Sequence, residues 1–123
     1  MRKLLFRGFN AKNKKWIYGF YIQNRGEHFI APDEFATGKS WEDYKVLPET
    51  VGQHTGMKDK NDKEIWEGDI VKADDDFVSE VYFNEYMAMF QIEDMRTDRA
   101  FTLYEWDLEV IGNIHDNPEL LKD

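Results

Sequence analysis

Hydrophobic and polar residues alternate with a period of two along much of this chain. The alternation is clearest over residues 86–93, where one face would carry Tyr86, Ala88, Phe90 and Ile92. Successive side chains of a β-strand point to opposite faces, so this period predicts strands that are buried on one side. No segment shows a sustained helical period of 3.6, so the sequence predicts an all-β fold with minor α content.

Alternating or apolar runs separated by polar, glycine and proline residues predict about nine short strands. These lie at residues 2–9, 15–22, 27–31, 46–51, 65–66, 70–73, 77–84 and 86–93, with the last strands around 101–103 and 108–111. The first two should form one hairpin, and 77–84 with 86–93 another around Asn84-Glu85. Turns spaced about 8 to 12 residues apart favour a barrel or sandwich over βαβ units.

Two short helical turns are expected outside these strands. Ser40 and Asp43 have the spacing of a capping box, and Asn117 with Pro118 has the residues of a helix start. Pro48 should end the first turn quickly.

Length and composition narrow the classes of protein. A chain of 123 residues suits one domain, and its aromatic content of 15% suits pleated, half-buried surfaces. It has no cysteine, which excludes a zinc site built from thiolates. No signal peptide and no long apolar run is apparent, so we expect a cytoplasmic protein without a membrane partner.

Charge is distributed unevenly. Residues 1–26 carry seven basic and no acidic side chains, while the remainder carries nine basic and 25 acidic ones, so the net charges are +7 and −16. The basic segment could lie against the acidic remainder, within one chain or between subunits. It could instead bind phosphate, or the acidic part could mimic nucleic acid.

Three stretches resemble the YopX family of phage- and prophage-encoded proteins. They are FRGFNAKNKKWIYG (6–19), PETVGQHTGMKDKNDKEIWEGDIV (48–71) and LEVIGNIHDNPELL (108–121). The resemblance implies an SH3-like small barrel in the C-terminal half, a phage-type accessory role in a bacterial host, and no assigned activity or catalytic residue. We therefore expect one YopX-like domain over 1–123, comprising an N-terminal β-hairpin layer and loop (1–47), the barrel (48–116) and a C-terminal turn (117–123).

The central stretch 50–71 could be scaffolding or a reactive site. As scaffolding, Gly52 and Gly56 would bracket a corner at 53–55, residues 58–64 would form a polar turn, and Gly68-Asp69 would turn into a strand. A metal site would instead group His54, Asp69, one of Asp74 to Asp76, and His115. The chain has no His-Glu-x-x-His spacing, no complete EF-hand pattern and no Gly-x-Ser-x-Gly elbow. The scaffolding interpretation is therefore favoured, and we expect no enzyme, no metal and no cofactor.

Function is expected to be binding of a protein partner or of a second copy, giving a homo-oligomer. The candidate partner-binding residues are basic, aromatic or acidic: Arg7, Lys14, Lys15, Trp16, Tyr18, Trp66, Asp74, Asp75 and Asp76. One alternative is nucleic-acid binding through the basic and aromatic N-terminal hairpin. Another is an acidic mimic that binds a host protein through Glu64, Glu67, Asp69, Asp74, Asp75, Asp76 and Glu80.

Overall fold

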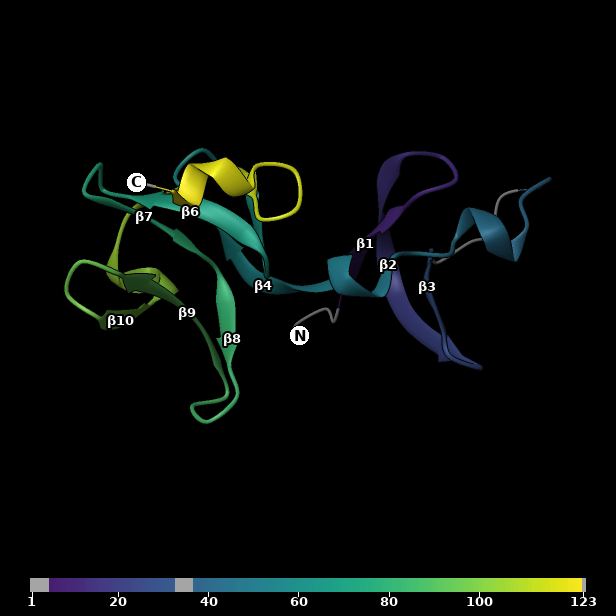
Figure 1. Cartoon of the computed structure of the whole chain (residues 1–123), viewed down its shortest axis with the longest axis horizontal. Coiled ribbons are helices and arrows are strands. Elements are labelled where there is room, and N and C mark those ends of the chain that lie inside the picture. The colour runs from purple at the N-terminus through teal and green to yellow at the C-terminus, as the bar shows by residue number, and fades with distance from the viewer. Residues whose placement is uncertain (1–4, 33–36, 123) are drawn as a thin grey trace. The chain divides into compact units, whose positions relative to one another are not determined.

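A computed structural model describes residues 5–32 and 37–122 of the chain, which fold into two compact units, 1–54 and 55–123. The expectation of a mostly β protein is confirmed, since the described residues form eleven strands and four short 3₁₀ turns, η1 to η4 (Figure 1). Antiparallel pairing joins β1 to β2 and β4, β2 to β3, β6 to β7 and β11, and β9 to β8 and β10. No helix in these two ranges is long and apolar enough to cross a membrane.

The first unit holds β1 (Phe6–Asn10), β2 (Lys15–Asn24), β3 (Glu27–Ala31), η1 (Trp41–Asp43) and η2 (Pro48–Thr50). Strand β4 (Gly52–Lys58) begins in this unit beside β1 and continues into the second, where β5 is its neighbour. The second unit holds β5 (Glu64–Trp66), β6 (Asp69–Ala73), β7 (Phe77–Glu80), β8 (Tyr82–Asn84), β9 (Met89–Asp94), β10 (Arg99–Thr102), η3 (Leu103–Glu105), β11 (Leu108–Asn113) and η4 (Pro118–Leu121).

A short extended segment closes the sheet of the first unit. Strands β1, β2 and β3 form two successive hairpins, as expected for 2–9, 15–22 and 27–31. The N–H of Val46 donates to the carbonyl of His28 on β3 (2.9 Å), and the N–H of Leu47 donates to that of Phe9 on β1 (3.0 Å). The segment thus links the two outer strands and buries the Val46 side chain, which is 4% exposed.

Two glycines allow close packing in this sheet, Gly8 against the closing segment and Gly19 against β3. A Cβ added at Gly8 would lie 2.8 Å from the Cβ of Val46. A Cβ added at Gly19 would lie 2.2 Å from the carbonyl oxygen of Ala31. The Val46 side chain fills the space at Gly8 and the β3 backbone fills it at Gly19, so neither position has room for a Cβ.

The prediction of one extended stretch over 46–51 is wrong, because residues 48–50 form η2. Pro48 at the first position favours a helical turn. The hydroxyl of Thr50 donates to the carbonyl of Leu47 (2.6 Å) and accepts the N–H of Phe9 (2.9 Å), which fixes the turn against β1.

The second unit encloses one hydrophobic core between two three-stranded sheets, ordered β10-β9-β8 and β11-β6-β7. The buried members are Ile65, Val71, Ala73, Phe77, Val81, Ile92, Leu103 and Leu108. Phe77, Phe101 and Trp106 pack edge-on or tilted beside it, with ring centroids 5.1 to 5.9 Å apart. This arrangement is compatible with the expected small barrel.

Two turn predictions in this half need correction. The expected corner at 53–55 is wrong, because those residues lie inside the continuous strand β4, where Gly56 alone has a positive φ of 87°. The hairpin after Asn84 exists, but residues 85–88 form its turn and only 89–94 form the strand. Ala88 adopts a φ of 54°, so the alternation of Tyr86 and Ala88 reflects a turn rather than a pleat.

Other local predictions are confirmed. Residues 59–63 form a turn, and Gly68 turns with a φ of 92° into β6. Asp43 accepts the N–H of Ser40 (2.9 Å), while the N–H of Asp43 donates to the Ser40 carbonyl (3.0 Å), which begins η1. Pro118 opens η4 after Asn117.

Candidate partner-binding surface

One basic and three aromatic side chains of β1 and β2 lie on one face of the first hairpin. Arg7 pairs with Tyr18 and Phe9 pairs with Trp16, so these four side chains share a face. The guanidinium of Arg7 lies 4.9 Å from the Trp16 ring centroid, and the whole residue is only 7% exposed. Such a geometry is a cation–π contact, so Arg7 supplies a fixed positive charge beneath an aromatic ring.

Large aromatic side chains of β2 face solvent on this unit. Tyr18 is 53% exposed and Phe20 is 49% exposed. Lys14, with a φ of 54° in the β1–β2 turn, and Lys15 at the start of β2 are both exposed. Exposed aromatic side chains are enriched at recognition sites, and lysines beside them can steer a partner of opposite charge.

A pocket of about 310 Å³ opens beside these residues. Its lining includes Lys15, Trp16, Ile17, Tyr18, Ile30 and Lys39. Ile30 is 1% exposed and therefore belongs to the floor, whereas the two lysines are exposed and belong to the rim. We call it the lysine-rimmed pocket.

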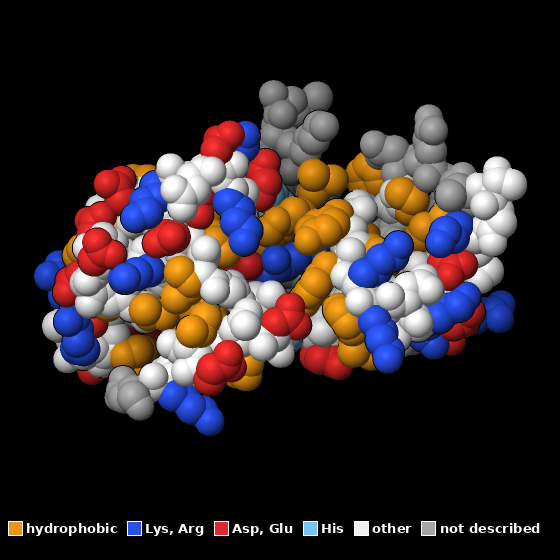
Figure 2. Space-filling view, turned by 90° about the horizontal axis from the view of Figure 1, so that it is seen from above, with side chains coloured by type: hydrophobic (Ala, Val, Ile, Leu, Met, Phe, Trp, Pro, Cys, Tyr) orange, Lys and Arg blue, Asp and Glu red, His pale blue; other side chains and the backbone are white. Residues whose placement is uncertain are grey.

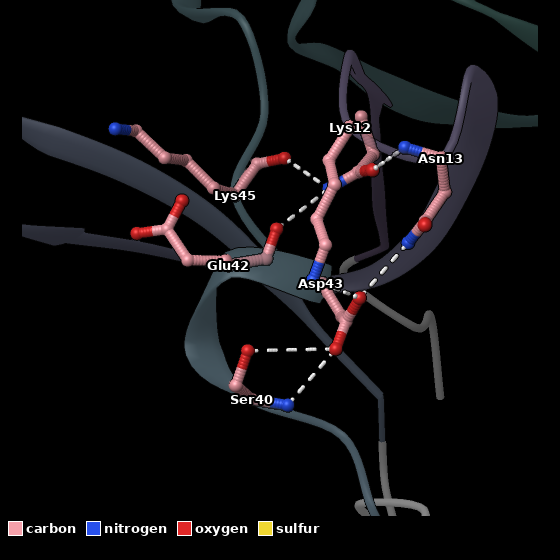
Figure 3. A network of polar contacts seen from close by, with 7 residues as sticks. Lys12, Asn13, Ser40, Glu42, Asp43 and Lys45 are labelled. Atoms are coloured by element: carbon pink, nitrogen blue, oxygen red, sulfur yellow. Dashed lines mark hydrogen bonds and ion pairs between the residues drawn. The ribbon is translucent and has the colours of Figure 1, made fainter.

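One wall of the lysine-rimmed pocket is held by a polar network around Asp43 (Figure 3). The Asp43 carboxylate accepts the N–H of Ser40 (2.9 Å), the amide of Asn13 (3.1 Å) and the ammonium of Lys12 (3.0 Å). These three donors, the Ser40 backbone first, hold the pKa of Asp43 well below its usual range. Asp43 is therefore ionised at neutral pH, and Lys12 balances its charge.

Asn10 anchors the same wall from inside. Its side-chain amide donates to the carbonyls of Glu42 (3.1 Å) and Lys45 (2.7 Å), and the residue is 1% exposed. Its oxygen accepts the N–H of Asn13 (2.7 Å). These hydrogen bonds hold the β1–β2 turn against η1, so the backbone that carries the lysines of the turn has a fixed position.

A second pocket of about 510 Å³ in the first unit has a different character. Ile22, Gln23, Asn24, Phe29 and Trp41 line it, and none of them is charged. Trp41 is 54% exposed and contacts Phe29 edge-on, with centroids 5.3 Å apart.

The two units carry charges of opposite sign. Residues 1–54 have nine basic and six acidic side chains, a net charge of +3, and residues 55–123 have seven and nineteen, a net charge of −12. Seen from one side, acidic side chains are dense over the part that carries β6 to β11, and basic ones are more prominent over the part that carries β1 to β3 (Figure 2). Any partner that recognises the first unit by charge should therefore be acidic.

The remaining candidate residues lie in the second unit and are engaged there. Trp66 is only 9% exposed, so its ring contributes to the interior rather than to a binding surface. Asp75 pairs with Lys72 (3.1 Å) and Asp76 with Arg96 (3.0 Å). Asp74 accepts the N–H of Asp107 (3.1 Å).

The expected acidic array is also divided by burial. Asp69 is 3% exposed and accepts the N–H of Trp66 (2.8 Å), so it stabilises the turn before β6. Burial, and then the neighbouring Glu67, raise the pKa of Glu80. The structure does not present Asp69 at the surface with the other carboxylates.

Histidine and carboxylate side chains do not assemble a metal centre in the part of the chain that the structure describes. No group of three or more such side chains there could hold an ion. His54 lies within β4, where its N–H donates to the carbonyl of Leu5 (2.8 Å). His115 lies in the exposed turn after β11, where its N–H donates to the Asn113 side chain (2.9 Å).

Asp59 is an organising residue that sequence reasoning placed in a turn but did not single out. One carboxylate oxygen accepts the N–H groups of Asn61 (2.8 Å) and Lys63 (2.9 Å), and the other accepts that of Val110 on β11 (2.9 Å). Burial opposes ionisation, but these donors outweigh it and lower the pKa of Asp59. An aspartate two residues before an asparagine and four before a lysine gives only a generic turn signal, and the contact with Val110 has no local signal.

Comparison with known proteins places the chain in a family. A family model described as YopX protein matches residues 5–122. The chain belongs to the YopX family. Protein EF1440 from Enterococcus faecalis, known from a crystal structure, is similar to this YopX protein, with 26% sequence identity and a TM-score of 0.59. The similarity covers 99% of this chain and 100% of that one. No curated protein matches the sequence.

Proposed function

We propose that this YopX protein is a non-enzymatic binding module whose first unit recognises an acidic protein surface. The observation that carries the proposal is the clustering of Lys14, Lys15, Trp16 and Tyr18 beside the lysine-rimmed pocket on a unit of net charge +3. The family resemblance adds a phage-type accessory role in the cytoplasm of a bacterial host as part of the same proposal.

The pattern of charge balance supports this surface over others. Asp43 is matched by Lys12, and Asp75 and Asp76 are matched by Lys72 and Arg96. Among the residues that the structure describes, no ion pair involves Lys14, Lys15 or Lys39. Their charge is therefore available to steer an acidic partner.

Nucleic acid is the second candidate, because the same surface combines aromatic rings with lysines. The net charge of −12 on the other unit disfavours it, since that charge repels phosphate at low salt. A titration of Trp16 fluorescence with single-stranded oligonucleotide distinguishes the two. We expect no change, and quenching with a steep salt dependence would favour nucleic acid instead.

Affinity capture from nuclease-treated bacterial lysate tests the proposal itself. The bait is the full chain, and the comparison is a variant that carries Lys14→Glu and Lys15→Glu. We expect acidic proteins to be retained by the wild type, released at about 0.5 M salt where charges are screened within a few Å, and lost with the variant. Equal retention by both baits would contradict the proposal. Lys122→Glu, a reversal at an exposed position near the C-terminal end, is the control for charge alone.

A further inference from the structure

The turn between β8 and β9 presents large apolar side chains to solvent. Tyr86 is 100% exposed, Met87 is 59% exposed and Phe83 is 39% exposed. Phe83 packs edge-on against Phe90, with ring centroids 5.1 Å apart, so the aromatic area continues down the hairpin. Single exposed apolar residues are common, but a contiguous group on one turn is typical of an interaction site.

The backbone of this turn is already organised without those side chains. The Asn84 side-chain oxygen accepts the N–H groups of Tyr86 (3.0 Å) and Met87 (3.1 Å). The Asn84 amide donates to the side chain of Gln91 (2.9 Å), which is 8% exposed. A preformed turn loses little conformational entropy on docking, which favours binding.

We propose that this turn of one copy docks into the lysine-rimmed pocket of a second copy. Tyr86 enters the pocket, and Glu85 lies against Lys15 and Lys39 on its rim. The inference rests on the proposed function, and it names the acidic protein surface as the β8–β9 hairpin of the same protein.

Charge and size support this pairing. Residues 77–93 carry three glutamates and no basic residue, whereas residues 10–18 carry three lysines and no acid. A pocket of about 310 Å³ is at the lower end of the range for ligand sites and suits a single aromatic side chain. The larger pocket beside Trp41 has no charged lining residue to pair with Glu85.

The pairing joins two different surfaces, so the resulting contact is heterologous. Each copy has one β8–β9 hairpin and one lysine-rimmed pocket, so a dimer joined by one such contact still has a hairpin and a pocket open to further copies. Such contacts produce a ring if the rotation closes and an open chain if it does not.

Sedimentation velocity at low salt, over a wide range of protein concentration, tests the docking. We expect the weight-average mass of the wild type to rise with concentration and fall with added salt. Tyr86→Ser should weaken association more than about tenfold, because a tyrosine that becomes buried on docking is a typical hot-spot residue. Tyr104→Ser is the matched control, since Tyr104 is 76% exposed on the same unit and should leave association unchanged.

A mixing experiment tests the heterologous geometry. Tyr86→Ser removes the hairpin contact and leaves the pocket, while Lys15→Glu with Lys39→Glu removes the pocket contact and leaves the hairpin. Each variant alone should be a monomer, and the mixture should give a 1:1 dimer that grows no further. Thermal melts of each variant confirm that it is folded.

A wild-type protein that stays monomeric at high concentration, or a Tyr86→Ser variant that associates like the wild type, would overturn the docking. Failure of the mixture to form a dimer would do the same. If the retention of acidic lysate proteins still depended on Lys14 and Lys15 in those cases, the proposed function would stand, but a second copy would not be the partner. If retention of acidic proteins did not depend on Lys14 and Lys15 either, both the docking and the proposed function would be contradicted.

Discussion

Two turns of the second unit show opposite uses of a polar side chain. In the turn at 59–63, the Asp59 carboxylate is 8% exposed and accepts three backbone N–H groups, one of them on β11. In the turn at 85–88, the Asn84 side chain accepts two N–H groups of the turn and donates to Gln91 in the same hairpin, while Tyr86 and Met87 face solvent. The first turn is scaffolding that holds distant strands together. The second is locally stable and leaves its apolar side chains free for a partner.

The two turns also show how the most patterned stretch of the sequence, 50–71, uses its polar side chains in the fold. Its conspicuous polar residues Asp59 and Asp69 are directed inward to backbone N–H groups. Tyr86 and Met87 looked like an ordinary strand in sequence, yet they form the exposed tip of a hairpin. A residue that stands out in the sequence pattern is therefore not necessarily exposed for binding, and an exposed residue need not stand out in the pattern.

The largest expected effect is at the scaffolding turn. Asp59→Ala leaves three N–H groups without their acceptor, two of them in the turn and one on β11. We expect it to lower the free energy of unfolding by about 2–4 kcal/mol, because three hydrogen bonds to a charged group are lost together and the half-buried N–H of Val110 loses its acceptor. Chemical denaturation with urea measures the change. A loss below about 0.5 kcal/mol would show that the turn contributes little.

The contribution of Asp59 should also depend on pH. Its pKa is lower in the folded protein than the ordinary value of 3.8, so its stabilisation is present above that value and is lost as pH falls below it. The difference in stability between wild type and Asp59→Asn should therefore shrink below about pH 4. A difference that stayed constant from pH 7 to pH 3 would argue against the ionised carboxylate as the organising group.

Asn84→Ala tests the second turn, at 85–88. It removes the acceptor of two N–H groups in an exposed turn, where water can replace it, and also the amide that donates to the buried Gln91 side chain. We therefore expect a loss of about 1–2 kcal/mol in urea unfolding. Association should weaken as well, because the turn is no longer preformed. Unchanged association with a destabilised turn would show that preorganisation of the hairpin is not required.

Trp106→Phe should have a small effect for a core substitution. The indole N–H of Trp106 is buried without a hydrogen-bond partner among the described residues, although its ring packs against Phe77 and Phe101. Removing an unsatisfied donor offsets much of the lost packing, so we expect a change within about 1 kcal/mol. A loss above about 3 kcal/mol would mean that packing of the indole outweighs the unsatisfied N–H.

The smallest expected change is in the stability of Tyr86→Ser. A side chain that is 100% exposed makes no contribution to the core, so the free energy of unfolding at low concentration should stay within about 0.5 kcal/mol of the wild type. A clear destabilisation would place Tyr86 in the fold rather than on a docking surface.

Much of the fold could be predicted from the sequence, because strands and their turns have local signals. The hairpin of β1 and β2, the bounds of β3 and both helical turns follow from alternation, glycine and capping residues. The closing segment at 44–47 could not be predicted, since its hydrogen bonds reach residues on β1 and β3 that are distant in sequence. The exposure of Tyr86 depended on where a turn ended, and the burial of Trp66 depended on the tertiary fold.

Hydrogen–deuterium exchange of the wild-type protein at increasing concentration tests the contrast between the two turns most directly. We predict that the amides of Asn61, Lys63 and Val110 are protected at every concentration, because Asp59 accepts them within each copy. The amides at 85–88 and at 14–18 should gain further protection as concentration rises, beyond that from the hydrogen bonds that the turn and β2 already make within one copy. Rapid exchange at Asn61, Lys63 and Val110, or exchange at 85–88 that does not respond to concentration, would contradict the account.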